Sequence, residues 1–148
     1  MTVDVPTIGW REWVSLPQFS LAMITAKVDT GALTSSLHAG ELLVVDDGPT
    51  PLARFEFHPD RDSEGEVTVV TAPVIDFREI TSSNGQTETR PVVRTELVLA
   101  NGRHEIDLTL TSRASMGHRL LLGRRFLADR FVVDPARTFL LAGSEVTS

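Results

Sequence analysis

The tetrapeptide Asp29-Thr30-Gly31-Ala32 lies near the centre of residues 24–38, which read ITAKVDTGALTSSLH. It follows a loosely alternating run, residues 21–28, of the kind expected for a half-buried strand. A turn at the end of a strand can hold a carboxylate in place, and a glycine beside it lets a substrate or a second carboxylate come close. The letters Asp-Thr-Gly are also ordinary turn chemistry in β-rich proteins, so the motif alone leaves both interpretations open.

The chain contains one copy of this motif. Two aspartates that share a proton have to lie about 3 Å apart, because like charges at that distance cannot both ionise. If Asp29 works in such a pair, its partner comes from another copy of the chain, and we expect a homodimer. A carboxylate from elsewhere in the same chain is the alternative.

Length and composition favour one cytoplasmic domain. The 148-residue chain is 41% hydrophobic, and we expect a single domain over residues 1–148 with frayed ends at about 1–6 and 143–148. It has no cysteine and no N-terminal apolar run of signal-peptide or membrane-span length, which predicts a cytoplasmic protein without disulfides or membrane contact. The net charge of −6 argues against nucleic-acid binding, which relies on a basic surface.

The basic residues are nearly all arginine, because thirteen of the fourteen are arginines and only Lys27 is a lysine. Guanidinium groups bind carboxylates through two parallel hydrogen bonds, which fits an acidic substrate. Codon usage rich in arginine is the competing explanation. Clustering of the arginines in the fold would favour a function.

Hydrophobic periodicity predicts strands along most of the chain. Short alternating or β-branched runs occur at residues 10–16, 21–28, 42–45, 54–57 and 67–75. The clearest hairpin joins residues 92–100 to 104–110 through Asn101-Gly102, a pair suited to the two positive φ angles of a type I′ turn. A second hairpin is expected around Ser83-Asn84-Gly85, and one short helix over residues 124–130. This pattern predicts a mainly β fold, a closed β-barrel with one short C-terminal helix.

Four blocks of sequence, in the same order, resemble one protein family. They are residues 8–17 (IGWREWVSLP), 24–38, 88–95 (ETRPVVRT) and 121–127 (LLGRRFL). Together they are similar to the bacterial retropepsin-like family that carries the label ATP-dependent zinc protease. The similarity extends over most of the chain and implies a barrel of the retropepsin, or acid protease, type.

The resemblance implies catalytic roles for Asp29, Thr30 and Gly31. Two Asp29 side chains, one per subunit, would hold a water molecule that attacks the scissile peptide bond directly. Thr30 would hydrogen-bond across the subunit interface, while Gly31 and Ala32 would lie near the substrate.

In aspartic peptidases, a short apolar strand that ends in glycine packs behind the aspartate loop, and the late block at residues 121–127 resembles this strand. The resemblance implies this supporting role for four residues, Leu121, Leu122, Gly123 and Arg124. On spacing alone the block is a buried strand with a glycine turn. Leu33 departs from the family pattern, because retroviral relatives have an acidic residue there that pairs with an arginine near the late helix, and the bacterial family often has a basic one. We therefore expect Arg124 and Arg125 to pair with Asp129 or with substrate.

The hairpin over residues 80–88, with Asn84 and Gly85 at its tip, is a candidate flap that closes over substrate; an exposed surface turn is the alternative. Three arginines lie around it, Arg78, Arg90 and Arg94. They can bind a polyanionic tail, or they can form a solvated face. The family often accompanies ATP-grasp ligases that add glutamates to the C terminus of a ribosomal protein. The resemblance thus implies a peptide or protein substrate, with oligoglutamate tails as the suggested class.

The family label names zinc and ATP, but the residues predict no metal and no cofactor. The histidines lack HExxH spacing, and Lys27 is not in a phosphate-binding loop. A loop with His58, Asp60 and Asp62 is the conceivable metal site, and a solvated turn is the alternative. His38 is close enough to the motif to lie in the cleft, or it is a core histidine bonded to a backbone carbonyl.

Two other functions compete with the peptidase. Serine chemistry lacks support, because no G-x-S-x-G elbow occurs and Ser35 and Ser36 fit local hydrogen bonding. A non-catalytic module that holds a peptide or an acidic tail on the retropepsin barrel is the main alternative. Leu33 favours the module. The intact motif at Asp29 favours the enzyme, because a pure binder gains nothing from two juxtaposed carboxylates.

Overall fold

The structure, a computed structural model, describes residues 5–58, 67–81, 84–112 and 118–141. The ends predicted to fray lie outside this part of the chain, apart from Val5 and Pro6. The strands are β1 (Thr7–Gly9), β2 (Arg11–Leu16), β3 (Leu21–Val28), β4 (Ser35–His38), β5 (Gly40–Val45), β6 (Leu52–Phe57), β7 (Thr68–Pro73), β8 (Asp76–Thr81), β9 (Thr87–Leu99), β10 (Gly102–Thr111), β11 (Leu120–Leu122) and β12 (Val132–Asp134). The helices are the 3-10 helix η1 (Pro17–Phe19) and α1 (Arg124–Leu127). In the described ranges, no helix is long and apolar enough to cross a membrane.

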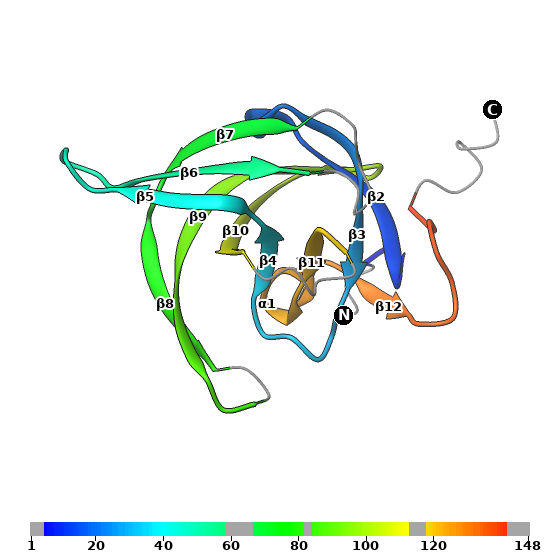
Figure 1. Cartoon of the computed structure of the whole chain (residues 1–148). Helices are drawn as coiled ribbons and strands as arrows, with labels where there is room; N and C mark the ends of the chain where they lie inside the picture. Colours follow the sequence, from blue (N-terminus) through cyan, green and yellow to red (C-terminus); the bar gives the residue numbers. More distant parts are fainter. Residues whose placement is uncertain (1–4, 59–66, 82–83, 113–117, 142–148) are drawn as a thin grey trace.

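A ring of strands closes into a barrel (Figure 1). The hydrogen-bonded order is β10-β4-β11-β3-β2-β9, and β9 pairs back to β10. β8 extends the sheet beyond β9, and β5, β6 and β7 form a second sheet of three strands. Closure leaves the ring strands without a free edge. The predicted mainly β, closed barrel with a short late helix is confirmed.

The ring is closed unevenly. β9 and β10 pair along most of their length, whereas β2 and β9 share the single residue pair Ser15–Val98 within the described chain. Near this pair, Gln18 Oε1 of η1 accepts hydrogen bonds from Thr95 Oγ1 at 3.0 Å and from the Glu96 amide at 3.2 Å. At this β2–β9 seam, a side chain therefore supplies hydrogen bonds that backbone pairing does not.

The hydrophobic core lies inside the ring. Alternation turns Val14 and Leu16 inward from β2 and turns Leu120 and Leu122 inward from β11, each at most 1% exposed. Phe55 reaches the same cluster from β6. Burying one side chain of this size contributes about 1.5–3 kcal/mol. The cluster thereby fixes β11 in the sheet, beside the loop that carries Asp29.

The predicted β9–β10 hairpin is confirmed, but its predicted turn is wrong. Gly102 already pairs with Leu99, so the two loop residues are Ala100 and Asn101 rather than Asn101 and Gly102. Gly102 is the residue of this turn with a positive φ, 139°. A type I′ turn needs a positive φ at both central residues, and Asn101 does not adopt one.

The late helix is shorter than the sequence predicts, because α1 ends at Leu127 rather than at residue 130. Asp129 has a φ of 66°, a left-handed conformation in which an α-helix does not continue. The turn directs the chain into β12, which pairs parallel with β1. Two strands differ from the predicted runs only at their ends. The run predicted at 67–75 forms β7, which covers Thr68–Pro73, and the run predicted at 10–16 forms β2, which begins at Arg11 because Trp10 separates it from β1.

A buried carboxylate attaches the last described residues to the barrel. Glu12 on β2 is 1% exposed. Its side chain accepts hydrogen bonds from the amides of Gly9 at 2.7 Å, Leu140 at 2.9 Å and Leu141 at 3.3 Å. These donors offset the cost of burying a charge. One carboxylate thus fixes both the corner between β1 and β2 and the segment that follows β12.

Candidate active site

Asp29 is the first residue after β3, on the loop that leads to β4. Its amide donates to Leu122 O of β11 at 2.9 Å, and its Oδ1 accepts the Gly31 amide at 2.9 Å. A Cβ on Gly31 would lie 3.1 Å from Oδ1, so a side chain there would crowd the carboxylate. In the described part of the chain no hydrogen bond reaches Oδ2. The loop therefore orients the carboxylate through one oxygen and leaves the other available.

The segment after β11 holds this loop from behind. The contacts are Gly123 N to Ser35 Oγ at 2.9 Å, Arg124 N to Ala32 O at 2.8 Å, and Arg125 N to Leu33 O at 3.0 Å. Gly123 has no space for a side chain, because a Cβ would lie 2.5 Å from Thr34 O. The first amides of a helix have no partner within the helix. Here two of them bind carbonyls of the Asp29 loop.

The Arg124 side chain also reaches the loop, where Nη1 donates to Thr30 O at 3.0 Å. The described residues show no ion pair from Arg124 or Arg125 to Asp129, so that alternative is wrong, and pairing with substrate stays a prediction. The Thr30 carbonyl gives Arg124 a partner although Leu33, which is 48% exposed, offers none. Leu121 lies on β11 and pairs with Lys27 of β3. Catalytic roles for the loop and its supporting residues stay predictions.

The second predicted hairpin is formed by β8 and β9, which pair antiparallel. Asn84 and Gly85 are exposed at its tip, where Gly85 has a φ of 85°; Ser83 lies outside the described residues. Figure 1 shows this hairpin and the β3–β4 loop extending from the barrel in the same direction. This is where a flap would lie, and its closure over substrate stays a prediction.

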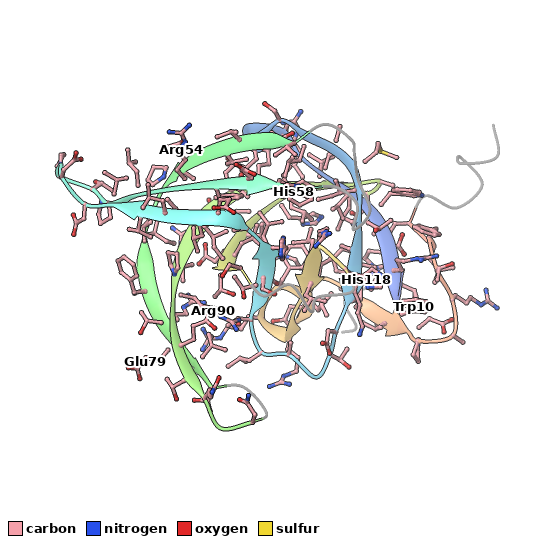
Figure 2. All side chains as sticks on the ribbon, in the orientation of Figure 1. Trp10, Arg54, His58, Glu79, Arg90 and His118 are labelled. Atoms are coloured by element: carbon pink, nitrogen blue, oxygen red, sulfur yellow. The ribbon has the colours of Figure 1, made fainter. Side chains whose placement is uncertain are left out.

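Two arginines lie opposite each other on this hairpin, Arg78 on β8 and Arg90 on β9. Arg90 is 9% exposed, and its Nε forms no hydrogen bond although Glu88 Oε1 lies 3.4 Å away. Figure 2 shows Arg90 on the side of the hairpin that faces β4 and α1, and Glu79 on the other side. The burial of Arg90 contradicts the expectation of a fully solvated arginine face.

A pocket of about 260 Å³ opens between the hairpin strands, β10 and α1. It is lined by Thr34, Ser35, Arg78, Arg94, Glu105, Ile106, Asp107, Arg125, Phe126 and Arg130. Arg94 binds Asp107 through two hydrogen bonds of 2.7 and 3.2 Å, and this contact raises the pKa of Arg94. Spacing in the sequence does not predict Arg125 and Arg130 as pocket residues, because α1 meets β10 only in the fold. Arg90 is not among the lining residues.

His38 on β4 is 8% exposed, and its Nδ1 has no hydrogen-bond partner. Burial lowers the pKa of His38, and the charges of Arg119 and His58 lower it further. A core position is one of the two predicted alternatives. That alternative also predicts a hydrogen bond from the ring to a backbone carbonyl, and for Nδ1 this prediction is wrong.

The described residues do not provide the zinc site that the family label names. His58 Nε2 lies 3.2 Å from Glu56 Oε1. No group of three or more histidine, aspartate or glutamate side chains suited to a metal occurs in the described ranges. Asp60 and Asp62, which complete the conceivable loop site, lie outside them. We therefore assign no step to a metal.

The closed barrel, with its aspartate on a loop supported by a strand that ends in glycine, defines a retropepsin-like protein. A family model described as RimB-like, retropepsin-like aspartic endopeptidase RimB, matches residues 7–142. The chain belongs to this family.

Curated relatives carry the name probable alpha-L-glutamate ligase. The protein from Shewanella pealeana is 40% identical over 134 residues, which are 90% of this chain and 29% of that protein. The protein from Desulfotalea psychrophila is 43% identical over 129 residues, 87% of this chain and 28% of that protein. The chain thus spans less than a third of the length of these relatives. A crystal structure of a protein of unknown function from Legionella pneumophila is 28% identical, with a TM-score of 0.76 over 93% of this chain and 99% of that one.

Proposed function

We propose that this protein is an aspartic endopeptidase of the retropepsin type. The observation that carries the proposal is the geometry of the Asp29 loop. The Gly31 amide holds Oδ1 at 2.9 Å, while Arg124 binds the loop through both its amide and its side chain. A general acid or base has to be positioned within hydrogen-bond reach of the reacting group. The unbonded Oδ2 is suited to that contact.

In the proposed mechanism, two Asp29 side chains bind one water molecule between them. The ionised carboxylate removes a proton from the water, and the protonated one donates a hydrogen bond to the scissile carbonyl. The water oxygen attacks the carbonyl carbon, and the tetrahedral intermediate collapses when the carboxyl group that took the proton from water passes it to the leaving amine, which breaks the C–N bond. No covalent bond forms between enzyme and substrate.

The exposed surface of the loop supports assembly of this site from two copies of the chain. Thr30 and Gly31 are exposed, and Leu33 is an apolar side chain that is 48% exposed beside them. The Thr30 hydroxyl forms no hydrogen bond within the described chain, so it is available to the loop of a partner. A homodimer would cover these groups and bring the two carboxylates together.

Acidic, glutamate-rich peptides are the substrate class that we propose. The relatives' name assigns glutamate ligation to those proteins, and the matched domain is a minor part of their length. A hydrolase that removes attached glutamates is chemically complementary to such a ligase. The guanidinium groups of Arg78, Arg94, Arg125 and Arg130 near the loop also favour an anionic substrate.

A non-catalytic module that holds an acidic peptide is the second candidate function. The relatives' name favours this candidate, because it describes a ligase and not a peptidase. Leu33 also departs from the pattern of the retroviral enzymes. Such a module would bind the peptide in the pocket beside the Asp29 loop and would not need the Asp29 carboxylate.

Mass spectrometry of peptide mixtures tests the two functions against each other. Peptides that include oligoglutamate-tailed sequences are incubated with the wild type and with Asp29→Asn, from acidic to neutral pH. Cleavage by the wild type alone would support the aspartic mechanism. Retention of peptide without cleavage by either protein would favour the binding module, and equal cleavage by both would exclude Asp29 as the catalytic group. A light-scattering mass of one subunit under cleaving conditions would contradict the two-copy site.

A further inference from the structure

The pocket between the hairpin, β10 and α1 has a charge opposite to that of the whole chain. Four arginines line it against two carboxylates, whereas the chain as a whole carries a net charge of −6. Its volume of about 260 Å³ is far larger than the ~30 Å³ of a water molecule. It is somewhat below the ~300–1,000 Å³ of sites that enclose drug-sized ligands. The pocket therefore suits an anionic side chain.

The positive charges in the pocket are not equally available. Asp107 holds Arg94 in two hydrogen bonds, and Glu105 lies 3.6 Å from the same guanidinium. These two contacts use both carboxylates of the lining. Arg130 donates to the Phe126 carbonyl at 2.8 Å and lies over the Phe126 ring, and no carboxylate of the described residues forms an ion pair with it.

Arg125 is the most available of the four arginines. Its backbone amide binds Leu33 O, but in the described chain its side chain forms no hydrogen bond or ion pair. Arg78 is held loosely, because its Nε lies 3.6 Å from Asp76 Oδ2. Two arginines of α1 and its following turn, Arg125 and Arg130, thus present unpaired charge from one side, and Arg78 presents part of its charge from the other.

The hairpin side of the pocket contains an electrostatic conflict. Arg78 and Arg90 lie directly opposite each other in the antiparallel pair, an arrangement that destabilises a sheet when the charges are alike. Arg90 is nearly buried, and its Nε donates no hydrogen bond, although Glu88 Oε1 lies 3.4 Å away and offsets part of its charge. Breaks in local rules of this kind are expected at functional sites. An anion bound beside Arg78 would reduce the repulsion.

We infer that this pocket is a carboxylate-binding subsite in which Arg125 and Arg130 hold an acidic side chain of the substrate and Arg78 assists from the hairpin. The inference rests on the proposed function for the identity of the ligand as an acidic peptide. The pocket shares Thr34 and Ser35 with the segment that begins at Asp29, and Ser35 accepts the Gly123 amide. A glutamate in the pocket would therefore lie near the residues that react, and would select acidic peptides.

Binding to catalytically disabled protein tests the subsite separately from cleavage. The 148-residue chain with Asp29→Asn is titrated by calorimetry with a dansylated oligoglutamate peptide and with an oligoglutamine peptide of the same length. We expect the acidic peptide to bind more tightly, and adding Arg125→Gln to weaken its binding on the order of tenfold, since the variant loses a hydrogen bond to a charged group. Binding of the glutamine peptide should not change. The matched control is Arg54→Gln, which removes the same charge from β6, far from Arg90 in Figure 2.

Arg125→Gln is the primary variant because no described side-chain contact is lost with it, whereas Arg130→Gln also removes a contact with Phe126. Unchanged binding in Arg125→Gln, or equal weakening by Arg54→Gln, would overturn the subsite. The result is distinguishable from failure of the proposed function. Selective binding of the acidic peptide without cleavage by the wild type would remove the peptidase and keep the subsite. Cleavage by the wild type, together with unchanged binding of the acidic peptide in Arg125→Gln, would remove the subsite and keep the peptidase.

Discussion

Replacing Gly123 by alanine tests whether the late segment positions the Asp29 loop. Gly123 has a φ of −96° and a ψ of 177°, which any residue adopts, so the effect of the added methyl group is steric. The new Cβ would lie 2.5 Å from Thr34 O and 3.0 Å from Ala32 O, and the backbone has to separate. Overpacking of this kind costs about 1–3 kcal/mol. Weakening the hydrogen bonds to Ser35, Ala32 and Leu33 adds roughly 1 kcal/mol for each bond lost.

We therefore expect Gly123→Ala to lower the free energy of unfolding by about 3 kcal/mol. With a urea slope of about 1–3 kcal/mol per molar, the unfolding midpoint falls by roughly 1–3 M. Peptide cleavage should fall by more than the loss of folded protein accounts for, because the displaced carbonyls belong to the Asp29 loop. The matched control is Gly48→Ala, since nothing lies within 4 Å of the Cβ it adds. Equal midpoints for Gly123→Ala and the wild type would refute the proposed support.

Three further predictions concern other parts of the molecule. Glu12→Ala leaves three amides without their acceptor, and we expect urea titration to show about 3 kcal/mol less stability. His38 has a pKa lowered from 6.5, so the unfolded chain takes up its proton first and stability should fall as pH drops below 6.5. Urea midpoints between neutral pH and about pH 5.5 should therefore change less in His38→Gln; an equal change would refute this. Gly31→Ala places a methyl group beside Asp29 Oδ1, and we expect at least about tenfold less cleavage, as for other small displacements of catalytic groups, with an unfolding midpoint close to that of the wild type.

Local patterns predict the fold where a strand has one buried face. The run at residues 21–28 becomes β3 with the predicted ends, and the hairpin of β9 and β10 is present. β4 escapes prediction, because all four of its residues are buried and it shows no alternation. The β9–β10 turn differs because strand register is decided by the whole ladder and not by the Asn101-Gly102 pair.

The sequence likewise predicts only part of the candidate site. Asp29 and Gly31 are predictable because a short motif places them on one turn. Arg125 and Arg130 are not, because their pocket is created by strands and a helix that are distant in sequence. The partner of Arg124 is also unpredictable from side-chain types, since it is the Thr30 backbone carbonyl.

The uneven closure of the ring has a consequence for slow motions. Opening of a sheet begins where the fewest hydrogen bonds have to break, and that place is the β2–β9 seam with its Ser15–Val98 pair and the Gln18 side chain. Amide hydrogens there should exchange with solvent sooner than those between β9 and β10. Because β9 also forms the hairpin with β8, which extends from the barrel in the same direction as the Asp29 loop (Figure 1), such an opening would change the distance between hairpin and loop while the other strands of the ring stay paired. Gln18, a residue outside the Asp29 loop, would then set how often this distance changes.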